Sequence, residues 1–429
     1  MEDKLKSFGL KVDSLIKGND LTRDQTKEMF RQVLLNEQPD LQQGAFLAAI
    51  TSKGPTPEEL AAAWEAIYEF DTVKVTPDVA GPLVDNCGTG MDTMKTFNIS
   101  TAASLIGAAD GVILAKHGAR AITSKCGVVD ILEALGVDVE CDVSLVKKSI
   151  ESAGIGIFNG MSAKVHPIAL FRILSQIRFG TILNMAGSLA NPASPTYGVR
   201  GVYSKELVLP VAKTMREIGY KAAIVVHGLN RDGSKGMDEI SSIGETSVAE
   251  LHPDGEITAY VLHPEQFRIK HARERELLCS FDKTEEALHF LRILGNEEVN
   301  SRKDIICLNA APILYIMGKA SNIEEGYDRA VEILESGRAL GKLRQWVRAQ
   351  NLEPEKNEER LQRLMEQANV DKGFSCVTTI RRENVISGQG QHEGVRQGQS
   401  DRGGYASGRQ LRGQGGDKMR QRQGVRRND

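Results

Sequence analysis

The sequence predicts an α/β protein in which a group of helices precedes a larger domain with a mostly parallel sheet, and a disordered tail follows. Three observations support this fold class. Residues 1–70 carry apolar side chains at helical spacing. From residue 77 onward, short apolar runs alternate with helical stretches, as in strands joined by crossover helices. Beyond residue 369, the composition offers little from which a core could be built.

Helix start signals divide the first 70 residues. Thr22 is placed to cap one helix, and Thr56 is placed to cap another. The second start is the stronger, because Pro57 occupies the first helical position and Glu59 the capping-box position. Between them, one apolar face predicts a helix over about residues 42–52.

The apolar runs expected to form strands cover residues 111–115, 137–140, 154–158, 222–226 and 256–262. Helical stretches cover residues 100–109, 129–135, 207–218 and 284–294, and helices return from residue 305 to about 347. Because strands and helices alternate, the sheet is expected to be largely parallel.

The composition favours a cytoplasmic protein. The 429 residues are 41% hydrophobic and 26% charged, and no uninterrupted apolar run approaches the roughly 18 residues of a membrane span. The charged start, M-E-D-K-L, lacks an apolar signal region. The six cysteines include no C-x-x-C pair, which fits reduced thiols and argues against a zinc site.

The tail differs in charge from the rest of the chain. Residues 370–429 hold 12 Lys and Arg against 6 Asp and Glu, whereas the whole chain holds 54 against 57. The tail also holds 12 Gly and 8 Gln, so disorder is expected. Its Arg-Gly pairs suit a polyanion, but Phe374 and Tyr405 are its only aromatics, so base stacking would be poor. An unstructured extension, or a segment outside the normal reading frame, is therefore favoured over a nucleic-acid arm.

The most informative segment is V-D-N-C-G-T-G-M-D at residues 84–92, followed by T-F-N-I-S-T at 96–101. Gly88 and Gly90 allow the backbone to approach a ligand closely. The following helix N-terminus offers unpaired N–H groups and the positive end of a dipole. This pattern predicts a polyphosphate site, although a G-T-G turn alone is more often an ordinary tight turn.

Two further segments place polar groups after predicted strands, where ligands bind in open α/β sheets. A-K-H-G at residues 115–118 offers Lys116 as a point charge for phosphate, while its histidine alone would more often be structural. Asp238 and Glu239 are adjacent in a loop after a strand. Carboxylates beside a diphosphate suit Mg²⁺, although an Asp-Glu pair in a loop is usually only solvated.

Seven motifs occur in one order: D-x-x-G-T-G-x-D, F-N-I-S-T, A-K-H-G, S-K-x-G-x-x-D-x-L-E-A-L-G, N-P-A, G-x-D-E and L-N-A-A. With these motifs, residues from about 20 to 347 resemble the anthranilate phosphoribosyltransferase family. The resemblance implies an enzyme of tryptophan biosynthesis. It would convert anthranilate and phosphoribosyl pyrophosphate to N-(5-phosphoribosyl)anthranilate and pyrophosphate, with Mg²⁺ as cofactor.

The resemblance also implies site residues. Those expected to bind phosphoribosyl pyrophosphate are Gly88, Thr89, Gly90, Asp92, Asn98, Ser100, Thr101, Lys116 and Ser124. Those expected around the amine are His117, Gly118, Ala119, His166, Arg172, Arg178 and Ser188. Ser100 would touch one Mg²⁺, and Asp238 and Glu239 would hold the second. An aromatic amine is already neutral and nucleophilic at pH 7, so no residue is assigned a proton-transfer role.

The family architecture implies a small helical domain, a large α/β domain and an active-site cleft between them. The expected boundaries are 1–72 for the first part of the helical domain, 73–165 for the first part of the α/β domain, 166–186 for helices completing the helical domain, 187–350 for the rest of the α/β domain, and 351–429 for a helical linker and the tail. Family members usually dimerise through the helical domain, so a homodimer is expected.

Departures from the family pattern gather on the amine side. Met91 replaces a glycine, Ala119 an asparagine and Ser188 a proline. The segment at 166–181 is about two residues short, and either Arg172 or Arg178 could pair with the anthranilate carboxylate. An insertion also lies between residues 228 and 238.

Three alternatives remain open. The chain could be a paralogue that uses another aromatic amine, because the amine side has changed. It could be a pyrimidine nucleoside phosphorylase, although Gly118-Ala-Arg stands where serine and threonine usually follow the Lys-His pair. It could also be a degenerate paralogue that binds nucleic acid through its tail, although the intact F-N-I-S-T and Asp-Glu motifs argue against decay.

Overall fold

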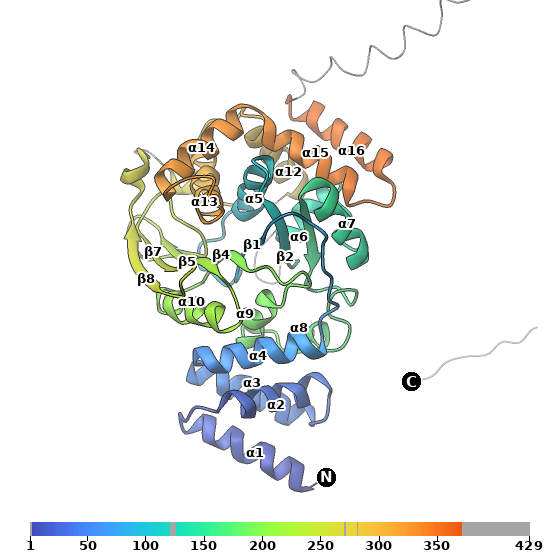
Figure 1. The fold of residues 1–429 in the computed structure, drawn as a ribbon, viewed down its shortest axis with the longest axis vertical. Helices are drawn as coiled ribbons and strands as arrows, with labels where there is room; N and C mark the ends of the chain where they lie inside the picture. Colours follow the sequence, from blue (N-terminus) through green and yellow to red (C-terminus); the bar gives the residue numbers. More distant parts are fainter. Residues whose placement is uncertain (1, 121–125, 270–271, 281, 371–429) are drawn as a thin grey trace, which may run out of the picture. The chain divides into compact units, whose positions relative to one another are not determined.

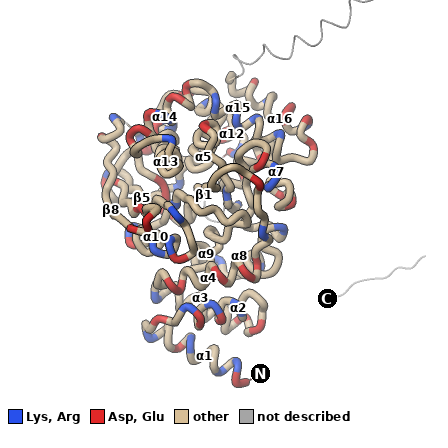
Figure 2. Tube along the Cα trace, viewed as in Figure 1, with Lys and Arg blue, Asp and Glu red and all other residues tan. Residues whose placement is uncertain are grey.

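The computed structural model describes residues 2–120, 126–269, 272–280 and 282–370 (Figure 1). The predicted tail therefore lies outside the described residues, apart from its first one, Val370. Among the described helices, none combines the length and the apolar character that a membrane crossing needs. Figure 2 shows acidic and basic residues interspersed along the helices on the face in view.

Four helices form the N-terminal end of the described chain: α1 (Glu2–Ile16), α2 (Arg23–Leu34), α3 (Asp40–Lys53) and α4 (Pro57–Phe70). Both predicted caps are confirmed, since Thr22 and Thr56 each form a capping box with the third residue of the helix. Phe30 and Phe46 meet edge to face at 4.9 Å in the core of this bundle.

Two short helices, α8 (Leu170–Ile177) and α9 (Ile182–Leu189), share the apolar core of the N-terminal bundle although they lie far from it in the sequence. In Figure 1 they lie between α4 and the sheet. The predicted domain boundaries themselves remain a prediction.

The sheet has the order β3-β2-β1-β4-β5-β7-β8, with β6 paired to β5. The strands are β1 (Leu83–Gly88), β2 (Ile113–Gly118), β3 (Ile155–Asn159), β4 (Tyr197–Gly201), β5 (Ala222–Leu229), β6 (Gly236–Met237), β7 (Thr246–Leu251) and β8 (Ile257–Leu262). The first five strands in this order are parallel and the other pairings are antiparallel, which confirms the mostly parallel sheet.

Helices cover both faces of the sheet, because the buried strands are apolar on both sides. In β5, Ile224 belongs to the core under α13, whereas Val225 belongs to the core under α10. The remaining α-helices are α5 (Ile99–Ala109), α6 (Val128–Ala134), α7 (Val143–Ala153), α10 (Val208–Glu217), α11 (Glu274–Leu277), α12 (Lys283–Leu294), α13 (Ser301–Ile316), α14 (Ile323–Glu335), α15 (Arg338–Ala349) and α16 (Pro354–Gln367).

The strand predicted over residues 137–140 is wrong. These residues connect α6 to α7, and the Asp138 N–H donates to the Gln350 carbonyl rather than to a neighbouring strand. Val137 and Val139 are buried, which explains the apolar pattern without a strand. The sequence reasoning also missed β4, whose residues Y-G-V-R-G lack an alternating apolar pattern.

Asp71 ties the N-terminal bundle to α8. Its carboxylate accepts hydrogen bonds from the backbone N–H groups of Ile168 (2.6 Å), Ala169 (3.0 Å) and Leu170 (2.8 Å). Asp71 is 1% exposed, so its carboxylate depends on these N–H donors in place of water. The carboxylate therefore fixes where α8 begins.

We expect Asp71→Asn to lower the free energy of unfolding by about 1–3 kcal/mol, because an amide cannot accept from three N–H groups and turns a donor toward one of them. Urea unfolding measures the change. Asp142→Asn is the matched control, since Asp142 precedes α7 without a side-chain capping bond. Equal stability of the two variants would contradict this assignment.

Candidate active site

A cavity of about 410 Å³ lies at the carboxyl ends of β1 and β2 and extends toward α8 and α9. Several separate segments of the chain meet around it. Its lining includes residues of the G-T-G segment, the start of α5, the K-H-G segment, the α8–α9 region and the Asp-Glu pair. The predicted ligand segments are thus brought together at the edge of the sheet where a ligand is expected.

Seven of the nine residues predicted to bind phosphoribosyl pyrophosphate line this cavity: Gly88, Thr89, Gly90, Asp92, Asn98, Ser100 and Lys116. Thr101 does not line it, because its side chain is fully buried within α5. Ser124 lies outside the described residues. Asn98 occupies the N-cap position of α5, but its amide nitrogen bonds the Cys126 carbonyl at 3.3 Å instead of capping the helix.

Two glycines, one at the end of β1 and one at the end of β4, permit the close approach of Asp238 to the sheet. A Cβ atom on Gly88 would collide with the Asp238 carboxylate, and one on Gly201 would collide with the Asp238 carbonyl. Gly90 has a φ of +69°, and its N–H donates to the Asp238 carboxylate at 2.7 Å. The glycines of this loop therefore serve its contact with Asp238 as well as its access to a ligand.

Lys116 is held inside the protein. Its ammonium donates to the Asn86 carbonyl (2.5 Å) and to the Ser104 hydroxyl (3.0 Å). Burial lowers the pKa of Lys116 to about 8. The Ser104 hydroxyl in turn donates to the Ser100 carbonyl at 2.7 Å, so Lys116 supports the first turn of α5.

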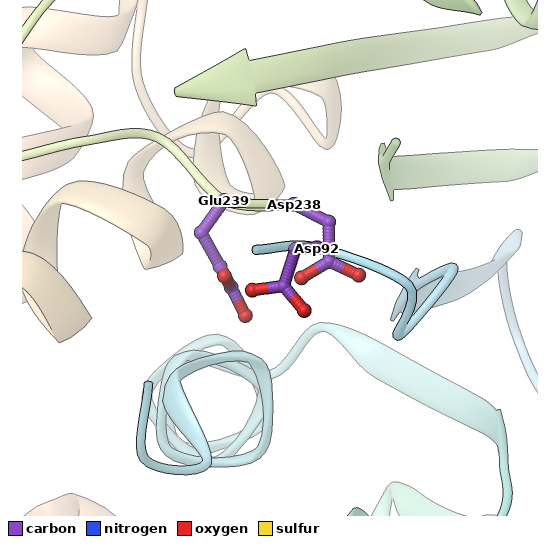
Figure 3. A group of neighbouring side chains, drawn as sticks. All are labelled: Asp92, Asp238 and Glu239. Atoms are coloured by element: carbon purple, nitrogen blue, oxygen red, sulfur yellow. The ribbon is translucent and has the colours of Figure 1, made fainter. Parts of the chain in front are cut away.

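Three carboxylates gather at one corner of the cavity. Asp92, Asp238 and Glu239 offer oxygen atoms that all lie within 4.8 Å of one another (Figure 3). Burial, and then the charge of Asp238, raise the pKa of Asp92 to about 7, and the same causes raise the pKa of Glu239 well above its ordinary value. One Glu239 oxygen is buried without a hydrogen-bond partner among the described residues.

This corner has the chemistry of a divalent-cation site. A cation would satisfy the unpartnered oxygen and relieve the repulsion between like charges. The sequence reasoning identified Asp238 and Glu239 as metal ligands but assigned Asp92 to phosphate alone. The third carboxylate is recognised only from the fold, because the segments that carry Asp92 and Asp238 meet at one edge of the sheet.

On the amine side, His117, Gly118, Ala119, Arg178 and Ser188 line the cavity, whereas His166 and Arg172 do not. His166 lies behind His117: its Nδ1 lies 2.7 Å from the Asp71 carbonyl oxygen, and its Nε2 lies 3.2 Å from Nε2 of His117. Burial, and then His166, lower the pKa of His117 to about 3, so the imidazole is neutral at pH 7.

The structure separates the two arginines that the sequence left as alternatives. The Arg172 guanidinium donates to the Val33 carbonyl (2.9 Å) and to the Gln43 side chain (3.3 Å), and so supports the N-terminal bundle. Arg178 ends α8 in a left-handed conformation and lines the cavity.

The sequence reasoning did not identify the apolar part of the lining. Leu170, Leu174, Phe179 and Leu183 from the α8–α9 region face the cavity. The Met91 side chain reaches from the G-T-G segment to Gly180, where a Cβ atom would collide with its methyl group. The cavity therefore combines a polar, acidic end with an apolar end.

Comparison with protein families gives two matches. The model described as glycosyl transferase family, a/b domain, matches residues 80–340, and the one described as glycosyl transferase family, helical bundle domain, matches residues 12–70. Similar proteins include the anthranilate phosphoribosyltransferase of Azospirillum brasilense, 39% identical over 336 residues, which are 78% of this chain and 90% of that protein. That of Methanococcoides burtonii is 36% identical over 339 residues, 78% of this chain and 92% of that protein.

Solved structures give the same result. Anthranilate phosphoribosyltransferase from Thermus thermophilus has a TM-score of 0.69 at 33% identity, covering 82% of this chain and 99% of that one. The Saccharomyces cerevisiae enzyme in complex with PRPP and Mg also has a TM-score of 0.69, covering 81% of this chain and 98% of that one. At 24% identity, this second likeness shows the fold alone.

Because Asp92 is buried beside two other carboxylates, Asp92→Asn should stabilise the protein when no cation is present. We expect its melting temperature in EDTA at pH 7 to exceed that of the unaltered chain by roughly 2–4 °C, as for about 1 kcal/mol. Saturating Mg²⁺ should then raise the melting temperature of the unaltered chain more than that of the variant.

Differential scanning fluorimetry checks this expectation. Asp78→Asn is the control, because it removes an exposed carboxylate outside the cavity and should change neither value. A lower melting temperature for Asp92→Asn in EDTA would show that the three carboxylates do not strain the fold.

Proposed function

We propose that this chain, which belongs to the anthranilate phosphoribosyltransferase family, transfers a phosphoribosyl group from phosphoribosyl pyrophosphate to the amino nitrogen of anthranilate. The products are N-(5-phosphoribosyl)anthranilate and pyrophosphate, as in tryptophan biosynthesis. One observation carries the proposal: a carboxylate corner beside a glycine-rich loop and an apolar end with an arginine share one cavity. The names of the similar proteins support it.

At the polar end, the backbone of the G-T-G segment and the first turn of α5 bind the pyrophosphate of the donor substrate. The N-cap residue Asn98 makes no side-chain capping bond to α5. The Ile99 N–H donates to the Phe97 carbonyl, so the N–H groups that follow it in the first turn are the ones available to phosphate oxygens. Asp238 and Glu239 would hold one Mg²⁺ with Asp92 beside them, and Ser100 would touch another. Mg²⁺ would neutralise charge on the leaving pyrophosphate.

At the apolar end, the leucines and Phe179 enclose the ring of anthranilate, and the Arg178 guanidinium pairs with its carboxylate. The amine needs no strong base, which fits a neutral His117 whose imidazole lies against that of His166. The reaction then depends on holding the amine nitrogen against C1 of the ribose, with water kept away by the apolar walls.

One specific observation favours an acceptor amine other than anthranilate. Met91 contacts Gly180 across the cavity, while Ala119 and Ser188 present a methyl and a hydroxyl group nearby. The apolar end thus differs in shape from the one that the family pattern implies. A heterocyclic or substituted aromatic amine could use the same phosphate chemistry.

We also propose that the protein is a cytoplasmic homodimer whose two subunits contact each other through their helical domains. Leu41 in α3 is 89% exposed, and Ile168 and Phe171 near the start of α8 are 48% and 56% exposed. Exposed apolar side chains of this size suit a subunit interface better than contact with water. Sedimentation velocity tests the dimer.

Replacing both loop carboxylates, Asp238→Asn with Glu239→Gln, should remove most turnover with little loss of fold. The isosteric amides keep the packing but bind Mg²⁺ poorly. Pyrophosphate release measures turnover, and circular dichroism checks the fold. The matched control, Asp254→Asn with Glu256→Gln, neutralises an exposed pair between β7 and β8 and should stay active. Normal turnover of the first variant at low Mg²⁺ would refute the metal role.

The two arginines should behave differently toward an amine that carries a carboxylate. Arg178→Ala should raise the KM for anthranilate roughly tenfold to a hundredfold, because one charged hydrogen-bonded pair is lost, and should leave the KM for aniline nearly unchanged. Arg172→Ala should instead lower the melting temperature without this discrimination, since Arg172 bonds the N-terminal bundle. The reverse pattern would show that α8 is oriented differently in the working enzyme.

A further inference from the structure

Asp92 and Asp238 each lie within two residues, along the chain, of a residue that contacts the other segment. Thr93 follows Asp92, and Gly236 lies two residues before Asp238. The Thr93 hydroxyl accepts from the Gly236 N–H at 2.9 Å and donates to the Gly236 carbonyl at 3.3 Å. The N–H groups of Thr93 and Met94 also donate to the same carbonyl, at 3.2 and 2.9 Å. Four hydrogen bonds thus join the two carboxylate-bearing segments.

A hairpin formed by the end of β5 and by β6 also holds Gly236 in place. Leu229 pairs with Gly236 across this hairpin, and the Asn230 N–H donates to the Lys235 carbonyl at 2.9 Å. The Arg231 guanidinium donates to the Ala272 carbonyl at 3.2 Å. These bonds give the inserted residues between β5 and the Asp-Glu pair a rigid connection to the rest of the domain.

The carboxylates need such a restraint because they repel one another. Asp92 is 8% exposed and lies beside two other acidic groups, so a free loop would turn its carboxylate toward water. The Thr93–Gly236 contact lies next to Asp92 in sequence and opposes that movement. Thr93 itself is exposed, does not line the cavity and is not needed to fill the core.

We propose that Thr93 is a positioning residue, which holds Asp92 opposite Asp238 and Glu239 through Gly236 and so sets the spacing of the cation site. The proposal rests on the Mg²⁺-dependent transfer proposed above. Without the Thr93 hydroxyl, the two backbone bonds remain but the side-chain bonds in both directions are lost. Asp92 then gains freedom, and the site binds its cation less tightly while the amine end is unchanged.

Thr93→Val tests this role because it keeps the shape of the side chain and removes the hydroxyl. We expect the concentration of Mg²⁺ that half-saturates turnover to rise about three- to tenfold, with the KM for anthranilate unchanged. Mn²⁺ binding in the presence of pyrophosphate, followed by the electron paramagnetic resonance signal of free Mn²⁺, should weaken by the same factor. Thr93→Ser should restore both values, since serine keeps the hydroxyl.

The matched control is Thr214→Val. Thr214 in α10 is buried outside the cavity, and its hydroxyl donates to the Pro210 carbonyl at 3.0 Å. This variant should lower the melting temperature and leave Mn²⁺ affinity unchanged, so a loss of stability alone cannot imitate the expected result. If Thr93→Val binds Mn²⁺ as tightly as the unaltered chain does, the positioning role is overturned. If instead the unaltered chain shows no metal-dependent transfer, the proposed function fails.

Discussion

The repulsion between Asp92, Asp238 and Glu239 is the constraint on which the rest of the site depends. One oxygen from each of them lies within 4.8 Å of the others, and the pKa of Glu239 is raised first by burial and then by its two neighbours. Such a group is unfavourable for folding alone. A protein keeps it only where a cation or a ligand makes the arrangement favourable, and where the backbone leaves the side chains no alternative position.

The fold supplies that backbone. β1, β4 and β5 are neighbours in the sheet, so the segments leaving β1 and β5 meet at one edge. Gly88 and Gly201 then let Asp238 approach to distances that any side chain would prevent. Because the surrounding helices cover both faces of the sheet, these strand ends cannot separate without exposing the core. The stability of the packed sheet thus offsets the repulsion among the three carboxylates at its edge.

The sequence predicted features that depend on residues close together in the chain, and it missed features that depend on distant residues. Caps such as Thr22 and Thr56 act within one turn, and their helices were predicted correctly. The strand expected over 137–140 failed because Val137 and Val139 are buried by residues distant in the chain. Asp92 as a third carboxylate, and the choice between Arg172 and Arg178, also depend on which segments meet. Spacing along the chain alone could not reveal either.

The two ends of the cavity are built differently, and this difference bears on specificity. The phosphate end lies on strand ends and on α5, which the sheet holds rigidly. The amine end lies on α8 and α9, two helices of 8 residues each that pack on the N-terminal bundle. A change in α8 or α9 can therefore reshape the amine end while leaving the phosphate end intact. Met91 is the exception, because it extends from the phosphate loop to Gly180. Its position makes the choice of amine depend on the phosphate loop as well.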